Sequence, residues 1–411
     1  MKTIIILGDG MSDHPVKALG GKTPLMVANK PNIDKIAANG QTGRFVSIPK
    51  GMSNGSAVAN LSVLGYDPSV CFQGRGVLEA ASMGVDLKDG DVALRCNLIC
   101  INKDGTIKNH SAGHISNEEA ATLIKDLDSA LGGSKGKYPV KLYPGVSYRH
   151  LMILEGGWAN PSVECFPPHD YVGVKADTLY PKANIFEAKE SASFLEELHK
   201  KAAEILKNHP VNIKRINRGL DPANSIWLWS PGVRPAMETM KSLYGINGAV
   251  ISAVDLIQGL GVLAGMKKIT VEGATGLFDT NYEGKAAAAL DAIKKHDLVY
   301  VHVEATDEAG HAKDLELKIK CIEYLDSRIV KPVLEGIKNM NEPVSIAVLP
   351  DHPTPVETGA HASDPVPVAI WRPDLKPDST ECYDENEVQT GALGLMHKNE
   401  FLLTALGLNK H

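Results

Sequence analysis

Residues 2–11, KTIIILGDGM, place a run of apolar, mostly β-branched residues directly before a Gly-Asp-Gly turn. Such a run is typical of a buried strand in a parallel sheet, and this strand would carry Asp9 at its carboxyl end. The same arrangement recurs at residues 296–311, HDLVYVHVEATDEAGH, and at residues 343–355, PVSIAVLPDHPTP. Ligands of an open α/β sheet bind at the carboxyl ends of its strands. Three such strand ends therefore predict one shared site.

The segments between these strands have helical periodicity. Residues 23–40 carry apolar side chains at helical spacing and end at a glycine, and residues 316–340 combine apolar positions three and four apart with pairs of opposite charge. Strands that alternate with helices predict the α/β class, with a mostly parallel sheet flanked by helices.

The middle of the chain has a different pattern. Residues 92–109, VALRCNLICINKDGTIKN, predict a hairpin that turns at Asp104 and Gly105, and a helical segment follows at residues 116–131. We therefore expect a smaller α+β domain inserted at residues 76–215. The core would consist of residues 1–75 and 216–411.

Composition excludes several classes of partner. The 411 residues contain 43 Lys and Arg against 49 Asp and Glu, a formal charge of −6, so neither nucleic acid nor an anionic membrane is expected as a partner. The six cysteines are scattered and predict free thiols in a reducing compartment. The apolar run at the N-terminus is too short for a signal sequence or a membrane span. We expect a soluble, cytoplasmic protein; its oligomeric state is not indicated.

The predicted strand ends carry side chains suited to metal binding. Carboxylate oxygens and imidazole nitrogens bind Zn²⁺ or Mn²⁺ well, and two ions at one site can activate a nucleophile for phosphoryl transfer. A single aspartate at a strand end is more often a cap, but three such ends are harder to explain in that way. Lone histidines, such as His296 and His302, are expected to be packed or solvated. The candidate ligands are Asp9, Asp307, His311, Asp351, His352 and His361.

Residues 51–68, GMSNGSAVANLSVLGYDP, begin as a loop and continue as a helix, with Ser56 at the junction. A serine in this position has two interpretations. It can be the N-cap of the helix, or it can be a nucleophile presented to an anion at the helix N-terminus. No Walker-type motif is present, which disfavours P-loop nucleotide chemistry.

Four stretches together resemble the archaeal type of cofactor-independent phosphoglycerate mutase, a family of the alkaline phosphatase superfamily. They are GDGMSD (8–13), GSAVANLSVLGYDP (55–68), ATDEAGHAKDLELKIKCIEYLD (305–326) and PDHPTPVETGAHASDPVPV (350–368). The resemblance implies an alkaline-phosphatase-like core and an inserted lid domain. It implies interconversion of 3-phosphoglycerate and 2-phosphoglycerate without bisphosphoglycerate, through a phosphoserine intermediate.

The resemblance also implies roles for individual residues. Ser56 would be the nucleophile. One ion would be held by Asp9, Ser56, Asp351 and His352, and the other by Asp307, His311 and His361. The two ions would be Mn²⁺, with Zn²⁺ or Mg²⁺ as alternatives, and the substrate would be a small phosphorylated metabolite.

Two features depart from the pattern of the mutases. Ala57 follows the serine, where an acidic residue is usual, and SAGHIS (111–116) replaces a basic stretch. An alanine also follows the nucleophile in the alkaline phosphatases. LPDHPTP (349–355) and SAGHIS resemble a bacterial subgroup of proposed homoserine kinases with the same fold, so a phosphotransferase of that kind is the alternative activity. A phosphomonoesterase is the third. The candidate anion-binding residues are His114, Arg218 and Arg234, chosen from a wider set that also contained Arg75, Arg149 and Arg215.

Overall fold

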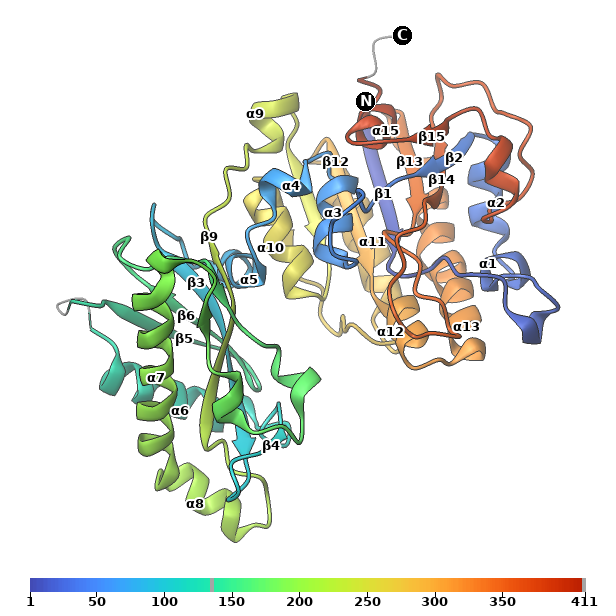
Figure 1. The fold of residues 1–411 in the computed structure, drawn as a ribbon. Helices are drawn as coiled ribbons and strands as arrows, with labels where there is room; N and C mark the ends of the chain where they lie inside the picture. The colour runs from blue at the N-terminus through green and yellow to red at the C-terminus, as the bar shows by residue number, and fades with distance from the viewer. Residues whose placement is uncertain (134–136, 409–411) are drawn as a thin grey trace. The chain divides into compact units, whose positions relative to one another are not determined.

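The computed structural model describes residues 1–133 and 137–408. The chain forms two compact units (Figure 1). The first unit contains Met1–Phe72 and the segment that begins at Ala236, and the second unit contains Gln73–Pro235.

The second unit extends further along the chain than the sequence analysis expected. The expected insertion ended at residue 215, whereas this unit ends at Pro235. The reason is strand β9 (Ser225–Val233), which pairs antiparallel with β3 (Val92–Ile101) and so belongs to the sheet of the second unit.

An eight-stranded sheet forms the centre of the first unit, in the order β11-β10-β12-β1-β13-β14-β2-β15. Strand β14 alone runs antiparallel to its neighbours, which confirms the predicted mostly parallel sheet. The central strands β12, β1 and β13 are buried on both faces, as continuous apolar runs require. The strands are β1 (Lys2–Gly8), β2 (Gln41–Phe45), β10 (Gly248–Ile251), β11 (Lys267–Ile269), β12 (Leu298–Val303), β13 (Val344–Leu349), β14 (Val366–Trp371) and β15 (Gly394–Met396).

Helices cover both faces of this sheet (Figure 1). Helices α2, α11, α13 and α14 pack on one face, around alternate residues of β1, β12 and β13. Helices α3, α10 and α15 lie on the other face. The helices of this unit are α1 (Pro24–Val27), α2 (Pro31–Ala38), α3 (Ser56–Val63), α4 (Pro68–Cys71), α9 (Met240–Tyr244), α10 (Asp255–Leu263), α11 (Tyr282–Ile293), α12 (Ala305–His311), α13 (Leu315–Leu325), α14 (Lys331–Ile337) and α15 (Glu400–Leu406).

The second unit has an antiparallel sheet in which β3 pairs with β4, β6 and β9, and β6 pairs with β5. The predicted hairpin and the helix after it are both present, as β3, β4 and α6. Helices α6 and α7 share one apolar core with the sheet. The remaining elements are α5 (Arg75–Ser82), β4 (Ile107–Asn109), α6 (Asn117–Leu131), β5 (Val140–Val146), β6 (Arg149–Leu154), β7 (Val163–Glu164), β8 (Lys182–Ala183), α7 (Lys189–Lys207) and α8 (Pro210–Asn217).

All six cysteines lie in the described ranges and are free thiols, as predicted. Among the described residues, no helix combines the length and the apolar character that crossing a membrane would need.

Candidate active site

The predicted strand ends meet at one edge of the sheet. Strands β12 and β13 both pair in parallel with β1, so the three carboxyl ends lie side by side. Asp9 follows β1, Asp307 lies in helix α12 after β12, and Asp351 follows β13. The sheet therefore brings Asp9, near the N-terminus, together with Asp307 and Asp351 from the last third of the sequence.

The first group of candidate ligands consists of Asp9, Asp351 and His352, all fully buried. The Nε2 atom of His352 lies 3.5 Å from Asp9 Oδ1 and 3.5 Å from Asp351 Oδ2. The other oxygen of Asp351, Oδ1, accepts the backbone N–H groups of Gly10 at 3.1 Å and of His352 at 2.9 Å. These bonds fix the carboxylate and leave Oδ2 turned toward the histidine.

Ser56 lies beside the first group. It is the first residue of α3, and the N-cap is Gly55, which makes no side-chain capping bond. The structure thus excludes the interpretation of Ser56 as a cap. The Ser56 hydroxyl oxygen lies 3.1 Å from His352 Nε2. The first N–H groups of a helix have no partner within the helix, so this hydroxyl lies where an anion is favoured.

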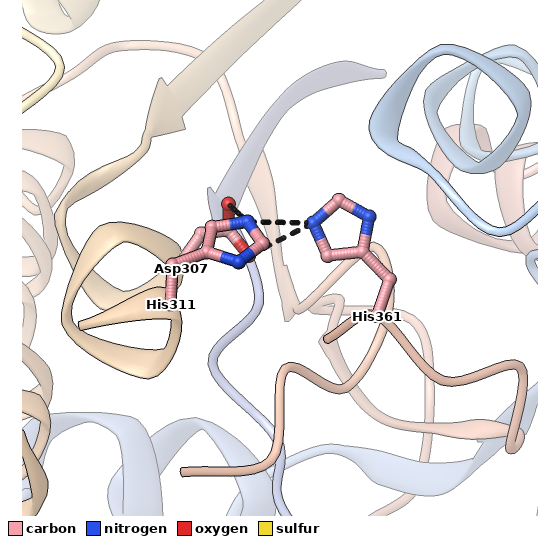
Figure 2. Close-up of side chains that lie close together, drawn as sticks. All are labelled: Asp307, His311 and His361. Atoms are coloured by element: carbon pink, nitrogen blue, oxygen red, sulfur yellow. Dashed lines mark hydrogen bonds and ion pairs between the residues drawn. The ribbon is translucent and has the colours of Figure 1, made fainter. Parts of the chain in front are cut away.

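The second group consists of Asp307, His311 and His361 (Figure 2). His311 Nε2 lies 3.0 Å from Asp307 Oδ2, and His361 Nε2 lies 3.5 Å from Asp307 Oδ1. The two imidazole Nε2 atoms are only 2.9 Å apart, so they require a shared proton or a cation between them. His311 Nδ1 donates to the carbonyl oxygen of Gly359 at 2.9 Å, which leaves Nε2 free to bind a metal.

The two groups adjoin each other. The rings of His352 and His361 have centroids 4.0 Å apart. The Thr354 hydroxyl donates to Asp307 Oδ1 and lies 3.3 Å from His352 Nδ1. Gly10 is required here, because it has a φ of +59° and a Cβ would lie 2.5 Å from Asp307 Oδ1.

The carboxylates of the site are crowded. Burial raises the pKa of Asp9 well above its usual value, and the negative charges of Asp351 and Glu304 raise it further. Burial and the charge of Asp307 raise the pKa of Glu304 to about 8. The hydrogen bond to Asp307 raises the pKa of His311 to about 9. For Asp307, burial opposes ionisation, but hydrogen bonds from His311 and His361 outweigh it and hold the pKa well below its usual value.

These residues fit divalent metal ions. Asp9 Oδ1 and Glu304 Oε2 are buried and have no hydrogen-bond partner in the part of the chain that the structure describes. A buried carboxylate oxygen without a partner is costly unless a cation neutralises it. Both groups offer carboxylate oxygens and imidazole nitrogens without a thiolate, which suits Zn²⁺ or Mn²⁺.

His302 contributes to the site, although the sequence analysis expected it only to be packed or solvated. It is buried, and its Nε2 atom lies 2.9 Å from Asp9 Oδ2. Its Nδ1 atom lies 3.3 Å from the Ser252 hydroxyl, and Lys285 Nζ donates to its carbonyl oxygen at 3.0 Å. The sequence feature that could have indicated this role is the position of His302 two residues before Glu304, at the end of a strand that leads to the candidate ligands.

The three predicted anion-binding residues lie in the second unit, and one of them, His114, lies near an aromatic ring. Arg218 is exposed and lies 3.4 Å from Glu119. Arg234 is exposed and contacts Asp86 at 3.4 Å. His114 is exposed with a φ of +52°, and its ring centroid lies 6.3 Å from that of Tyr148. Their role in substrate binding stays a prediction.

Three arginines of the second unit, Arg75, Arg95 and Arg149, form a cation cluster beside aromatic rings. The Arg95 guanidinium lies 4.2 Å from the centre of the Trp229 ring. Burial lowers the pKa of Arg95, its ion pair with Glu79 at 2.7 Å raises it, and the positive charges of Arg75 and Arg149 lower it. Ring contacts connect this cation cluster to the imidazole groups of His110, His114 and His169.

Sequence comparison with known proteins finds relatives that share one family description. A family model described as "2,3-bisphosphoglycerate-independent phosphoglycerate mutase" matches residues 37–212. A protein of that name from Methanosarcina barkeri is 50% identical, with 98% of each chain covered. A "probable 2,3-bisphosphoglycerate-independent phosphoglycerate mutase" from Geobacter sulfurreducens is 44% identical, with 100% of each chain covered.

Two solved structures are similar to this chain in fold. The PH0037 protein from Pyrococcus horikoshii has a TM-score of 0.83 and 30% identity, over 100% of this chain and 98% of that chain. A cofactor-independent phosphoglycerate mutase from Thermoplasma acidophilum has a TM-score of 0.67 and 26% identity, over 99% of this chain and 100% of that chain.

Proposed function

This chain belongs to the 2,3-bisphosphoglycerate-independent phosphoglycerate mutase family, and from this premise we propose that it interconverts 3-phosphoglycerate and 2-phosphoglycerate through a phosphoserine at Ser56. One observation carries the proposal. The Ser56 hydroxyl lies at the start of α3 and 3.1 Å from His352, beside two adjoining groups of acidic and imidazole ligands.

The phosphoryl group moves in two balanced steps. In the first step, the Ser56 oxygen bonds to phosphorus while the bond from phosphorus to the C3 oxygen of 3-phosphoglycerate breaks. The proton lost by the serine ends on that C3 oxygen. In the second step, the C2 hydroxyl oxygen of the same glycerate bonds to phosphorus while the bond from phosphorus to the Ser56 oxygen breaks, and the hydroxyl proton passes to Ser56. The glycerate must therefore stay bound between the steps.

The ligand groups divide between two ions. Asp9, Ser56, Asp351 and His352 would hold one ion; Asp307, His311 and His361 would hold the other. Divalent ions in such a site lower the pKa of the serine hydroxyl and offset the charge of the transferring phosphoryl group. Mn²⁺ is the proposed metal, since it accepts a mixed set of oxygen and nitrogen ligands, as Zn²⁺ and sometimes Mg²⁺ also do.

The second unit is the proposed lid domain. The cation cluster of Arg75, Arg95 and Arg149 suits the carboxylate and phosphate groups of a phosphoglycerate, because guanidinium groups bind such anions in a bidentate manner. A lid that excludes water would keep the phosphoserine from hydrolysis during reorientation of the glycerate.

The test compares two serines of one helix. Ser56→Ala is expected to abolish mutase turnover in an enolase-coupled assay with Mn²⁺, since no other hydroxyl occupies its place. Ser62→Ala, a buried serine later in α3, serves as the matched control and should keep the activity. Intact-mass measurement after mixing with substrate should show a phosphorylated protein for the wild type and not for Ser56→Ala. Removing metal with EDTA should abolish turnover, and Mn²⁺ should restore it.

Several outcomes would contradict the proposal. Turnover retained by Ser56→Ala would refute the phosphoserine mechanism. A wild-type protein that leaves phosphoglycerate unchanged but phosphorylates homoserine from a phosphoryl donor would instead establish the homoserine kinase-like activity. Release of inorganic phosphate as the main product would indicate a phosphomonoesterase.

A further inference from the structure

Asn60 joins the start of α3 to the first group of ligands. It is fully buried and lies four residues after Ser56 on the same helix. Its side-chain nitrogen donates to the carbonyl oxygen of Ser56 at 2.8 Å and to Asp351 Oδ2 at 2.8 Å. One amide group therefore connects the backbone of the proposed nucleophile to a carboxylate of the first group.

Tyr300 completes the hydrogen bonds of this amide. Its ring is fully buried, and its hydroxyl donates to Asn60 Oδ1. The Asp351 carboxylate and the Ser56 carbonyl only accept hydrogen bonds, so they face the amide nitrogen of Asn60, and the amide oxygen is left to accept from Tyr300. The reversed amide would place its oxygen against the Asp351 carboxylate, which cannot donate a proton when ionised.

Tyr300 and His302 lie two residues apart on β12, so both side chains leave the same face of the strand. His302 contacts Asp9 directly, and Tyr300 reaches Asp351 through Asn60. One strand thus supports both carboxylates of the first group. Partners of this kind orient the ligands of a metal site.

We propose that Asn60 is a positioning residue for phosphoryl transfer and that Tyr300 holds its amide in place through the amide oxygen. The amide holds Ser56 at a fixed position relative to Asp351, so that the nucleophile and the carboxylate act on the same phosphoryl group. The inference rests on the proposed function in taking Ser56 as the nucleophile. An error of about 1 Å in the placement of a reacting group costs about a hundredfold in rate.

The experiment uses the full chain loaded with Mn²⁺ and compares Tyr300→Phe and Asn60→Ala with the control Tyr383→Phe. Tyr383 is also fully buried in the first unit, and its hydroxyl donates to the carbonyl oxygen of Pro367 at 2.8 Å. Each Tyr→Phe change removes one buried hydrogen bond, so both should lower the melting temperature by a similar amount. Only the changes at Tyr300 and Asn60 should alter the site.

We expect Tyr300→Phe to lower kcat about tenfold and Asn60→Ala to lower it about a hundredfold, with KM for 3-phosphoglycerate within about twofold of the wild type. Calorimetric titration of the metal-free proteins should show Mn²⁺ affinity reduced about tenfold in both variants. Tyr383→Phe should leave kcat and Mn²⁺ affinity unchanged. Asn60→Ala removes a buried amide, so Tyr300→Phe decides the outcome if that protein does not fold.

The inference is overturned if Tyr300→Phe matches Tyr383→Phe in kcat and in Mn²⁺ affinity, because the hydrogen bond would then be only structural. Failure of the proposed function has a different signature: the wild type itself would show neither mutase turnover nor a phosphorylated Ser56. In that case the Mn²⁺ affinity of the two variants still tests the role of Asn60. An unchanged affinity in Tyr300→Phe and Asn60→Ala would overturn this role. A reduced affinity would support the hydrogen bond from Asn60 to Asp351 as a support of the metal site.

Discussion

Arg149 and Arg218 are both exposed cations of the second unit, but their surroundings differ. Arg218 lies 3.4 Å from Glu119, so part of its charge is already offset. Arg149 belongs to the cation cluster with Arg75 and Arg95, and its guanidinium lies 5.8 Å from the centre of the Tyr148 ring. Glu79 pairs with Arg95 at 2.7 Å, but the three arginines outnumber this acidic partner, and the excess of positive charge favours an anionic ligand.

We therefore predict different effects of removing the two charges. Arg149→Ala should raise KM for 3-phosphoglycerate about tenfold or more, because a hydrogen bond to a charged group contributes about 1.5–3 kcal/mol. Arg218→Ala should change KM less than about twofold. Steady-state kinetics of the two variants measure this. The reverse order of effects would favour the anion-binding residues predicted from sequence.

At the scale of single elements, helix α13 is attached to the strand-end loops of the site by one buried lysine. Lys318 Nζ donates to the carbonyl oxygens of Ser12 at 3.0 Å and Thr354 at 2.8 Å, and to Asp13 Oδ2 at 2.8 Å. Both charged side chains are almost fully buried. The Thr354 hydroxyl also donates to Asp307, so Lys318 supports the second ligand group through Thr354.

Removal of one partner of this pair should be costly. Lys318→Met would leave the Asp13 carboxylate buried without its cation, and we expect the free energy of unfolding to fall by about 3–5 kcal/mol. Urea denaturation measures the change. Arg328→Ala provides the comparison, since its pair with Glu283 is partly exposed and should contribute about 1 kcal/mol or less. Equal losses in the two variants would contradict the buried-pair argument.

At the scale of the whole molecule, the sequence predicted what depends on local pattern. The α/β class follows from the apolar runs, and the ligand groups follow from the position of Asp9, Asp307 and Asp351 directly after those runs. The supporting residues escaped prediction, because Asn60 and Tyr300 look like ordinary core positions and their partners lie far away in sequence. The C-terminal boundary of the second unit was not predicted for the same reason, since only the pairing of β9 with β3 assigns β9 to this unit.

Two buried histidines should make the second unit sensitive to acid. His199 and His150 are buried there, and burial lowers their pKa to about 4 and about 3. His199 Nδ1 donates to the carbonyl oxygen of Leu195, and its Nε2 accepts from the N–H of Leu228, so the native state holds it neutral. An unfolded histidine has a pKa near 6.5 and binds a proton at higher pH than these do.

The sign of the effect follows from proton counts. Between about pH 6.5 and pH 4 the unfolded chain binds a proton at each histidine and the native chain does not, so stability is full above pH 6.5 and falls as the pH decreases. Each histidine contributes a slope of about 1.4 kcal/mol per pH unit.

Three tryptophans, at positions 158, 227 and 229, lie in the second unit, and only Trp371 lies in the first. In a Trp371→Phe background, tryptophan fluorescence therefore reports unfolding of the second unit. Adding His199→Gln should reduce the slope below pH 6.5 by about 1.4 kcal/mol per pH unit, and an unchanged slope would show that His199 does not stay neutral in the native protein.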